Sequence, residues 1–320
     1  MWSRRLLPMI LLFSIAVHAQ ARADGPAVVA TIAPVHGILA AVMEGSGHEP
    51  ALLLPGQTSP HLARLRPSQA AMLEDADLIV RIGPDLETFL DHLLDAPENA
   101  ARVLTLEDLP GIVRHEGRRA GAFETGVIVH NDHGMTSDHD NGHEDHDHDG
   151  LDPHIWLDPE NGRVMAVAMA DRLALLDPAH AETYRANAAA LGKRLDGTEQ
   201  AIDAMLAPVR HRRYLVLHDA YSGFEGRFGL SPVGAFSVAP ERPPGSRRVE
   251  ELRHIVSSGD IACVFTEPQL DPAWVEAILA ENSVNKGVLD PLGMTLPTGV
   301  EFYPALLMNL AISLHDCLRP

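Results

Sequence analysis

Short apolar runs of strand length alternate with stretches of helical pattern along most of the chain. The run at residues 27–32 is followed by Pro34 and a helical pattern, and the run at residues 78–82 is followed by Gly83, Pro84 and another. Strands that alternate with helices predict parallel sheets covered by helices on both faces. The other predicted strands lie at residues 51–54, 103–106, 214–217, 233–236, 261–265 and 288–289. The pattern therefore predicts an α/β protein with two lobes.

One long amphipathic stretch separates the strands of the two lobes. Asp177 and Pro178 have the residue types of a helix N-cap and first turn, and Pro208 ends the pattern. Its apolar side recurs in steps of four and three residues on either side of Thr198: Tyr184, Ala188, Leu191, Leu195, Ile202 and Met205. A helix of about 29 residues spans about 43 Å and is stiffer than a flexible loop. The predicted divisions are an N-terminal lobe at 24–176, a linking helix at 177–208 and a C-terminal lobe at 209–320.

The first 23 residues have the pattern of a secretion signal. Arg4 and Arg5 precede an apolar run at residues 8–19, and Ala21-Arg22-Ala23 fits a signal-peptidase site. The alternative is an N-terminal membrane anchor, for which this run is too short. We predict cleavage near Ala23, a mature chain in the periplasm, and no membrane-spanning segment in that mature chain.

The charge balance is strongly acidic. The chain has 44 Asp and Glu against 25 Lys and Arg, which gives a formal net charge of −19. Such a charge argues against nucleic acid and anionic membrane surfaces as partners, because both are themselves negative. It suits a protein that attracts cations, and the 18 histidines are an unusual number for 320 residues.

A polar segment at about residues 115–150 interrupts the alternation of strands and helices. It is too poor in apolar residues to bury a core, so we predict a mobile loop. Histidines mixed with Asp, Gly and Asn crowd its second half: His130, His133, His139, His143, His146 and His148. The segment is either an auxiliary metal-binding loop or a solvated acidic tract.

Three histidines and one aspartate occupy positions that favour ligand binding. His61 and His218 each follow a predicted strand, and Asp290 follows the last predicted strand. His154 lies in a turn framed by prolines. In parallel sheets ligands collect at the carboxyl ends of strands. Three imidazoles with a carboxylate or water suit tetrahedral Zn(II), and the combination carries the prediction because a single histidine is more often structural.

The two cysteines, Cys263 and Cys317, lack the close spacing of a redox or zinc motif. In an oxidising compartment the pair would form a disulfide, which would stabilise the protein by about 4 kcal/mol. The alternative is two unpaired buried thiols.

A secreted zinc hydrolase is the main alternative to a binding protein. Such an enzyme needs an open metal position and a placed general base. The chain contains no H-E-x-x-H, no G-x-S-x-G and no phosphate loop. We therefore predict that the protein is not an enzyme.

Six motifs follow one another along nearly all of the mature chain. They are residues 28–34, 55–68, 152–159, 218–221, 265–269 and 290–293. Together, and in this order, they resemble the solute-binding proteins of bacterial high-affinity zinc-uptake ABC transporters, the metal-binding cluster A-I family. The resemblance implies two Rossmann-like lobes, each a parallel sheet flanked by helices, joined by one long rigid helix.

The resemblance also implies a ligand set. The metal histidines of the family match His61, His154 and His218, and Asp290 matches a carboxylate that approaches the metal in many members. Manganese-binding relatives carry Glu at the position of His218, so His there favours zinc over manganese or another divalent metal. Some members have a Glu before the first metal histidine, where this chain has Pro60. The fourth ligand is therefore either Asp290 or water.

The remaining expectations concern the residues that support the metal ligands, the disulfide, and the cargo and partner of the protein. Glu267 and Asp152 are candidates to hydrogen-bond the metal histidines, although Glu267 fits a loop or lobe contact equally well. The resemblance implies a Cys263–Cys317 disulfide and an acidic His-rich loop. It further implies that Zn(II) is a transported cargo, that a membrane ABC permease is the partner, and that the protein is a monomer.

Overall fold

The computed structural model describes most of the chain beyond the predicted signal. The described residues are 25–94, 96–118, 121–122, 150–237, 246–257, 260–270, 275–276, 279 and 284–320. The predicted signal peptide and the loop histidines His130, His133, His139, His143, His146 and His148 lie outside these residues. Within the described part, no helix is both long and apolar enough to cross a membrane.

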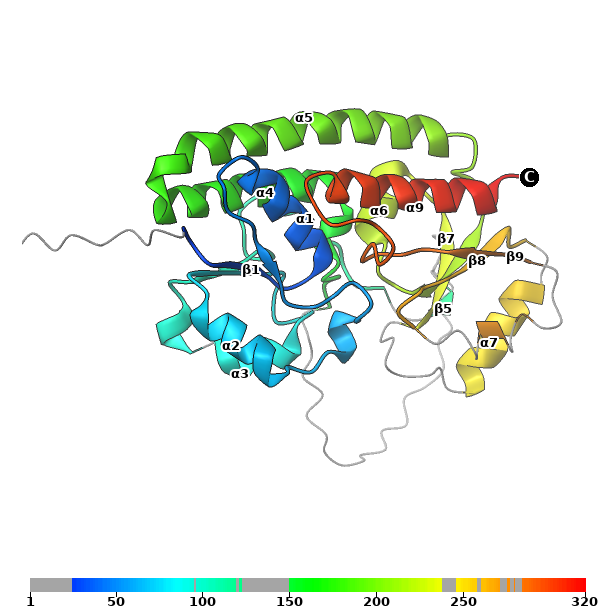
Figure 1. The fold of residues 1–320 in the computed structure, drawn as a ribbon. Helices are drawn as coiled ribbons and strands as arrows, with labels where there is room; N and C mark the ends of the chain where they lie inside the picture. The colour runs from blue at the N-terminus through cyan, green and yellow to red at the C-terminus, as the bar shows by residue number, and fades with distance from the viewer. Residues whose placement is uncertain are drawn as a thin grey trace, which may run out of the picture.

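The first lobe is built on a four-stranded parallel sheet. Its strands are β1 (Val28–Ala30), β2 (Ala51–Leu52), β3 (Leu78–Arg81) and β4 (Val103–Thr105), in the order β2-β1-β3-β4. Helix α1 (Ala33–Met43) is buried along almost its whole length. Helices α2 (Pro67–Asp75) and α3 (Asp91–Leu94) lie on the other side of the sheet from α1 (Figure 1).

The second lobe holds a five-stranded sheet of which four strands are parallel. Its order is β5-β7-β6-β8-β9, with β5 (Gly121–Ala122), β6 (Tyr214–His218), β7 (Pro232–Ser237), β8 (Cys263–Thr266) and β9 (Asn285–Val288). The helices of this half are α6 (Ser222–Phe228), α7 (Ser246–Ser257) and α9 (Phe302–Leu318). The predicted α/β architecture of two helix-flanked parallel sheets is confirmed.

Strand β5 is a departure from the expectation for the polar segment. It falls within the predicted loop at 115–150, yet it pairs antiparallel with β7 at the edge of the second sheet. Two residues with the composition Gly-Ala carry no strand pattern of their own. The pairing therefore depends on the edge that β7 offers.

Two antiparallel helices form the connection between the lobes. Helix α4 (Pro159–Leu176) starts behind the N-cap Asp158, whose Oδ1 accepts from the Glu160 backbone N–H at 2.9 Å. A 3₁₀ turn (Pro178–His180) leads into α5 (Ala181–Leu206), so the predicted long helix is present, with a 3₁₀ first turn. Helix α5 packs on α4, α1 and α9 and runs over both lobes (Figure 1).

The two lobes share a central core, and each sheet also packs a separate apolar cluster on its other face. Buried side chains of both sheets and of α1, α4, α5 and α9 form a single cluster. Helix α9 returns to the first lobe, where Phe302 packs so closely against Gly37 that a β-carbon there would clash. Trp156, fully buried, donates its indole N–H to the Pro291 carbonyl at 2.8 Å. These contacts fix the facing edges of the two lobes.

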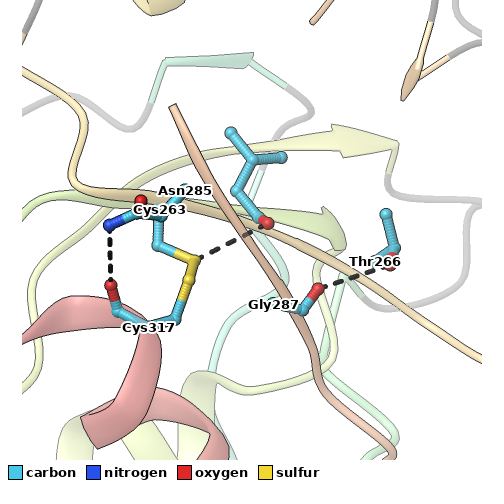
Figure 2. Close-up of a disulfide and its surroundings, with 6 residues drawn as sticks. Cys263, Thr266, Asn285, Gly287 and Cys317 are labelled. Carbon is cyan, nitrogen blue, oxygen red and sulfur yellow. Dashed lines mark hydrogen bonds between the residues drawn. A yellow bond between two sulfur atoms is a disulfide. The ribbon is translucent and has the colours of Figure 1, made fainter. Parts of the chain in front are cut away.

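The second lobe contains the disulfide that the resemblance implies. Cys263 of β8 and Cys317 of α9 are joined, with Cα atoms 5.9 Å apart (Figure 2). Beside it, the Asn285 side chain donates to the Cys317 carbonyl at 3.4 Å. The bond therefore ties the last helix to the second sheet.

Candidate metal centre

The first candidate ligand, His61, lies on a single turn after β2. A 3₁₀ helix (Pro60–Leu62) follows Ser59, and Pro60 fixes the backbone at its first position. The turn is closed by a hydrogen bond from the Ala63 N–H to the Pro60 carbonyl at 3.4 Å. His61 is partly exposed, so it is the ligand that faces the solvent most directly.

The second candidate, His154, is held by the carboxylate two residues before it. Asp152 Oδ1 lies 2.7 Å from His154 Nδ1 and accepts from the His154 backbone N–H at 2.9 Å. The other oxygen of Asp152 accepts from the Ser222 hydroxyl. Burial alone would raise the pKa of Asp152, but these hydrogen bonds and the His154 ring lower it to about 2. A charged Asp152 fixes the Nδ1–H tautomer and leaves His154 Nε2 free to bind a metal.

The third candidate, His218, ends the buried strand β6. Its Nδ1 lies 2.6 Å from Oε1 of Glu267, which follows the neighbouring strand β8. Burial would lower the pKa of His218, but the attraction and hydrogen bond of Glu267 outweigh burial and raise it. Burial and the nearby Glu267 carboxylate raise the pKa of the Tyr221 hydroxyl well above its usual value, and that hydroxyl donates to the Leu289 carbonyl at 3.5 Å. Glu267 therefore orients His218 from the end of an adjacent strand, as Asp152 orients His154 from within its own turn.

The three imidazoles converge on one point. His154 Nε2 lies 3.1 Å from His61 Nε2 and 3.2 Å from His218 Nε2, and one ring nitrogen from each residue falls within a 4.8 Å group. A tetrahedral zinc ion with Zn–N bonds of about 2.0–2.1 Å separates its nitrogens by about 3.3 Å. The cavity beside these rings has a volume of about 10 Å³, close to the room that one water needs.

The electrostatics favour a neutral ring at His61. Burial, followed by the neighbouring rings of His154 and His218, lowers the pKa of His61 to about 2. Neutral imidazole is the form that binds metals, because a protonated nitrogen has no lone pair to donate. The lone pairs of the three crowded ring nitrogens repel one another, and a divalent cation that accepts all three would remove this repulsion.

Asp290 lies outside the convergent group. It is buried, and its Oδ1 accepts from the Gln269 side chain at 2.6 Å and from the Gly293 N–H at 2.9 Å. Its Oδ2 accepts from the Met294 N–H at 2.6 Å. In this structure Asp290 therefore organises the loop after β9, and its coordination of the metal stays a prediction.

Sequence reasoning missed three residues that complete the site. Ser222 binds Asp152, Gln269 binds Asp290, and Trp156 packs against the His154 ring with centroids 5.2 Å apart. Trp156 and Gln269 lie inside quoted motifs and Ser222 directly follows one, so the motifs indicated their neighbourhood. Their roles depend on contacts between segments that a linear pattern does not encode.

The class of protein follows from this arrangement. Two α/β lobes joined by a rigid helical connection, with convergent imidazoles from both lobes between them, define a metal-binding protein of the solute-binding type. The more specific assignment comes from the comparisons: the family model "Zinc-uptake complex component A periplasmic" matches residues 28–317. The chain belongs to that family. It is therefore a component of a zinc-transport system and not an enzyme.

Individual relatives agree with the family assignment. The high-affinity zinc uptake system protein ZnuA of Brucella abortus (strain 2308) is 40% identical over 310 residues, which cover 91% of each chain. A crystal structure of ZnuA superposes with a TM-score of 0.72 at 24% identity, covering 92% of this chain and 100% of that one. A zinc-bound ZnuA deletion mutant gives a TM-score of 0.71 at 24% identity over 93% and 99% of the chains. The structural likenesses establish the fold.

Proposed function

We propose that the protein binds Zn(II) in the periplasm, at His61, His154 and His218 in the cleft between its lobes, and delivers it to a membrane ABC permease. The observation that carries the proposal is the convergence of three Nε2 atoms, with neighbours 3.1 and 3.2 Å apart. Asp290 or a water supplies the fourth ligand. The name of the Brucella relative, a high-affinity zinc uptake protein, supports the choice of cargo.

The ligand chemistry favours zinc over manganese, the alternative cargo in this transporter class. Imidazole nitrogens suit zinc, whereas carboxylate and water oxygens suit manganese. Both carboxylates that touch the site, Asp152 and Glu267, are hydrogen-bonded to ring Nδ1 atoms rather than placed among the convergent nitrogens. The three convergent side chains therefore all offer nitrogen, which supports zinc over manganese.

Metal analysis of the untagged mature protein, purified from the periplasmic fraction, tests the proposal. We expect one tightly held zinc per chain, with the bound metal lost in the His61→Ala, His154→Ala, His218→Ala triple variant. His92→Ala is a matched control, because His92 is exposed on α3. Manganese in place of zinc, or zinc retained by the triple variant at the same affinity, would overturn the assignment.

Delivery to the permease needs a separate experiment. Cells that lack the chromosomal gene should grow under zinc chelation when they carry the wild-type gene. They should fail with the triple variant, although that variant is exported and folded. Rescue by the triple variant would show that transport does not pass through these histidines.

A further inference from the structure

A second group of metal-ligating side chains lies outside the cleft. One ligand atom from each of His48, Asp177 and His180 falls within a 4.8 Å group. His48 precedes β2, Asp177 ends α4, and His180 belongs to the turn that opens α5. All three are partly exposed, so a metal ion can reach them from solvent. Three separate segments of the first lobe thus bring two imidazoles and one carboxylate together.

The group is already ordered by its own contacts. Asp177 Oδ2 lies 2.7 Å from His180 Nδ1 and accepts from the Tyr184 hydroxyl at 2.8 Å. The rings of His48 and His180 meet edge to face with centroids 5.8 Å apart. Gly25 packs on the His48 ring so closely that a β-carbon there would overlap it. These contacts lower the entropy that a metal would otherwise lose in collecting three mobile side chains.

The charge of Asp177 suits a cation. Burial opposes ionisation, but the hydrogen bonds from Tyr184 and His180 and the nearby imidazoles together outweigh it and lower the pKa of Asp177. The carboxylate is therefore ionised at neutral pH. Two imidazole nitrogens and one carboxylate oxygen form a ligand set that zinc accepts, with water in the remaining position.

This group is remote from the cleft. His48 lies before the amino end of β2, whereas His61 follows its carboxyl end. Asp177 and Asp158 flank opposite ends of α4, whose 18 residues span about 27 Å. In Figure 1 the turn between α4 and α5 lies at the outer end of the first lobe, away from the second lobe. A metal there would not share ligands with the cleft.

We infer that His48, Asp177 and His180 form a second Zn(II) site on the first lobe. The metal fastens the segment between α1 and β2 to the start of the linking helix α5. The adjoining solvent-open cavity of about 560 Å³, lined by His36, His48 and Glu49 among others, provides the approach. The ligands of this site are more exposed than those of the cleft, and no buried carboxylate among the described residues orients their rings. This site therefore binds zinc more weakly than the cleft.

Zinc titration of the mature full-length protein, with the cleft first filled by one equivalent, tests the inference. We expect the His48→Ala, His180→Ala double variant to lose one weaker equivalent, or to weaken it more than tenfold, with the first tight equivalent unchanged. The His92→Ala, His254→Ala double variant is the matched control, because it removes two exposed histidines elsewhere. Any zinc bound at residues 130–149 is common to all these proteins and cancels in the comparison.

A second variant and a second probe guard against loss of folding. Asp177→Asn keeps the shape of the side chain and removes its charge, and it should weaken the same equivalent. Cobalt(II) added to the cleft-filled protein should give absorption bands that the double variant lacks. If the double variant, Asp177→Asn and the control all bind the same number of zinc ions with the same affinities, the second site does not exist. The proposed cleft function would be untouched by that result.

Discussion

The two lobes support their candidate metal histidines by the same kind of contact, a carboxylate hydrogen-bonded to ring Nδ1, but from different positions in the chain. In the first lobe the carboxylate that holds His154 is Asp152, two residues away in the same turn. In the second lobe the carboxylate that holds His218 is Glu267, which is 49 residues away and directly follows the neighbouring strand β8. The local pair is ordered by its own backbone, while the distant pair needs an intact sheet. The support of His218 therefore depends on the folding of the second lobe, and Asp152 is tied to the same lobe through Ser222.

The lobes also differ in how they are stabilised. The second carries a disulfide between its sheet and its last helix. The first carries the fully buried Glu87, whose pKa is raised to about 7 by burial. The second lobe is thus strengthened by a covalent bond, and buried Glu87 weakens the first lobe at neutral pH, although burial also raises the pKa of Glu225 in the second lobe.

The largest effect should come from removing a buried ligand from either lobe. His154→Ala and His218→Ala should each weaken zinc binding about a thousandfold, about 4 kcal/mol, because both rings are buried and oriented by carboxylates. His61→Ala should cost less, about a hundredfold, because His61 is partly exposed and lies on a short turn. Competition with a chelator of known affinity measures all three. Equal losses would mean that burial and orientation do not set the strength of each ligand.

The next largest effect should come from removing the disulfide, which only the second lobe carries among the described residues. The Cys263→Ser, Cys317→Ser variant loses a cross-link over 54 residues, which the chain-entropy relation values at about 4 kcal/mol. Urea unfolding of the metal-free protein should show this loss as a lower midpoint, with a steeper slope because the unfolded chain without the cross-link exposes more surface. Zinc affinity of the folded variant should change little, because neither cysteine touches the histidines. An unaltered midpoint would show that α9 is held by packing alone.

Sequence patterns were most informative where a feature repeats or stays local. The stripe from Tyr184 to Ile202 predicted the buried face of α5, and each of its members is buried. At its end the pattern chose Met205, whereas Leu206 is the buried residue, since contacts with other elements decide between neighbouring positions. The local pair of Asp152 and His154 could be predicted for the same reason as the stripe.

Features that depend on segments meeting in space could not be predicted. The hydrogen bonds that Asp290 accepts from its loop and from Gln269 follow from the packing of the second lobe. The group of His48, Asp177 and His180 forms only because α1, α4 and α5 pack together. The motifs located the cleft histidines, but they gave no information on which nitrogen of each ring faces the metal.

A smaller effect should reveal the buried acid of the first lobe. The pKa of Glu87 is about 7 in the folded protein against 4.5 as its ordinary value, so its ionisation costs stability as pH rises from 4.5 and costs most above 7. Glu87→Gln should stabilise the metal-free protein by about 3 kcal/mol at pH 8 and by almost nothing at pH 4. The amide can accept from the Gly83 N–H and donate to Thr31, which replaces the present contacts.

Urea unfolding at several pH values measures this difference. The exposed Glu74→Gln is a matched control in the same lobe and should show no such pH dependence. If Glu87→Gln changed stability equally at pH 4 and pH 8, the cost would not arise from ionisation of Glu87.

The smallest effect should come from changing Asp152 or Glu267, the carboxylates that hold His154 and His218. It tests whether the local pair and the pair between segments differ in strength. Loss of a hydrogen-bond partner of a metal ligand typically weakens binding by about 10- to 100-fold. Asp152→Asn should fall near tenfold, since its amide oxygen can still accept from the His154 ring and backbone and its amide can donate to Ser222. Glu267→Gln should approach a hundredfold, because among the described residues the Glu267 side chain contacts His218 without a backbone bond of the kind that Asp152 has. Chelator competition, with the exposed Glu44→Gln as control, ranks the two. A larger loss for Asp152→Asn would show that the local pair, rather than the pair between segments, limits the order of the site.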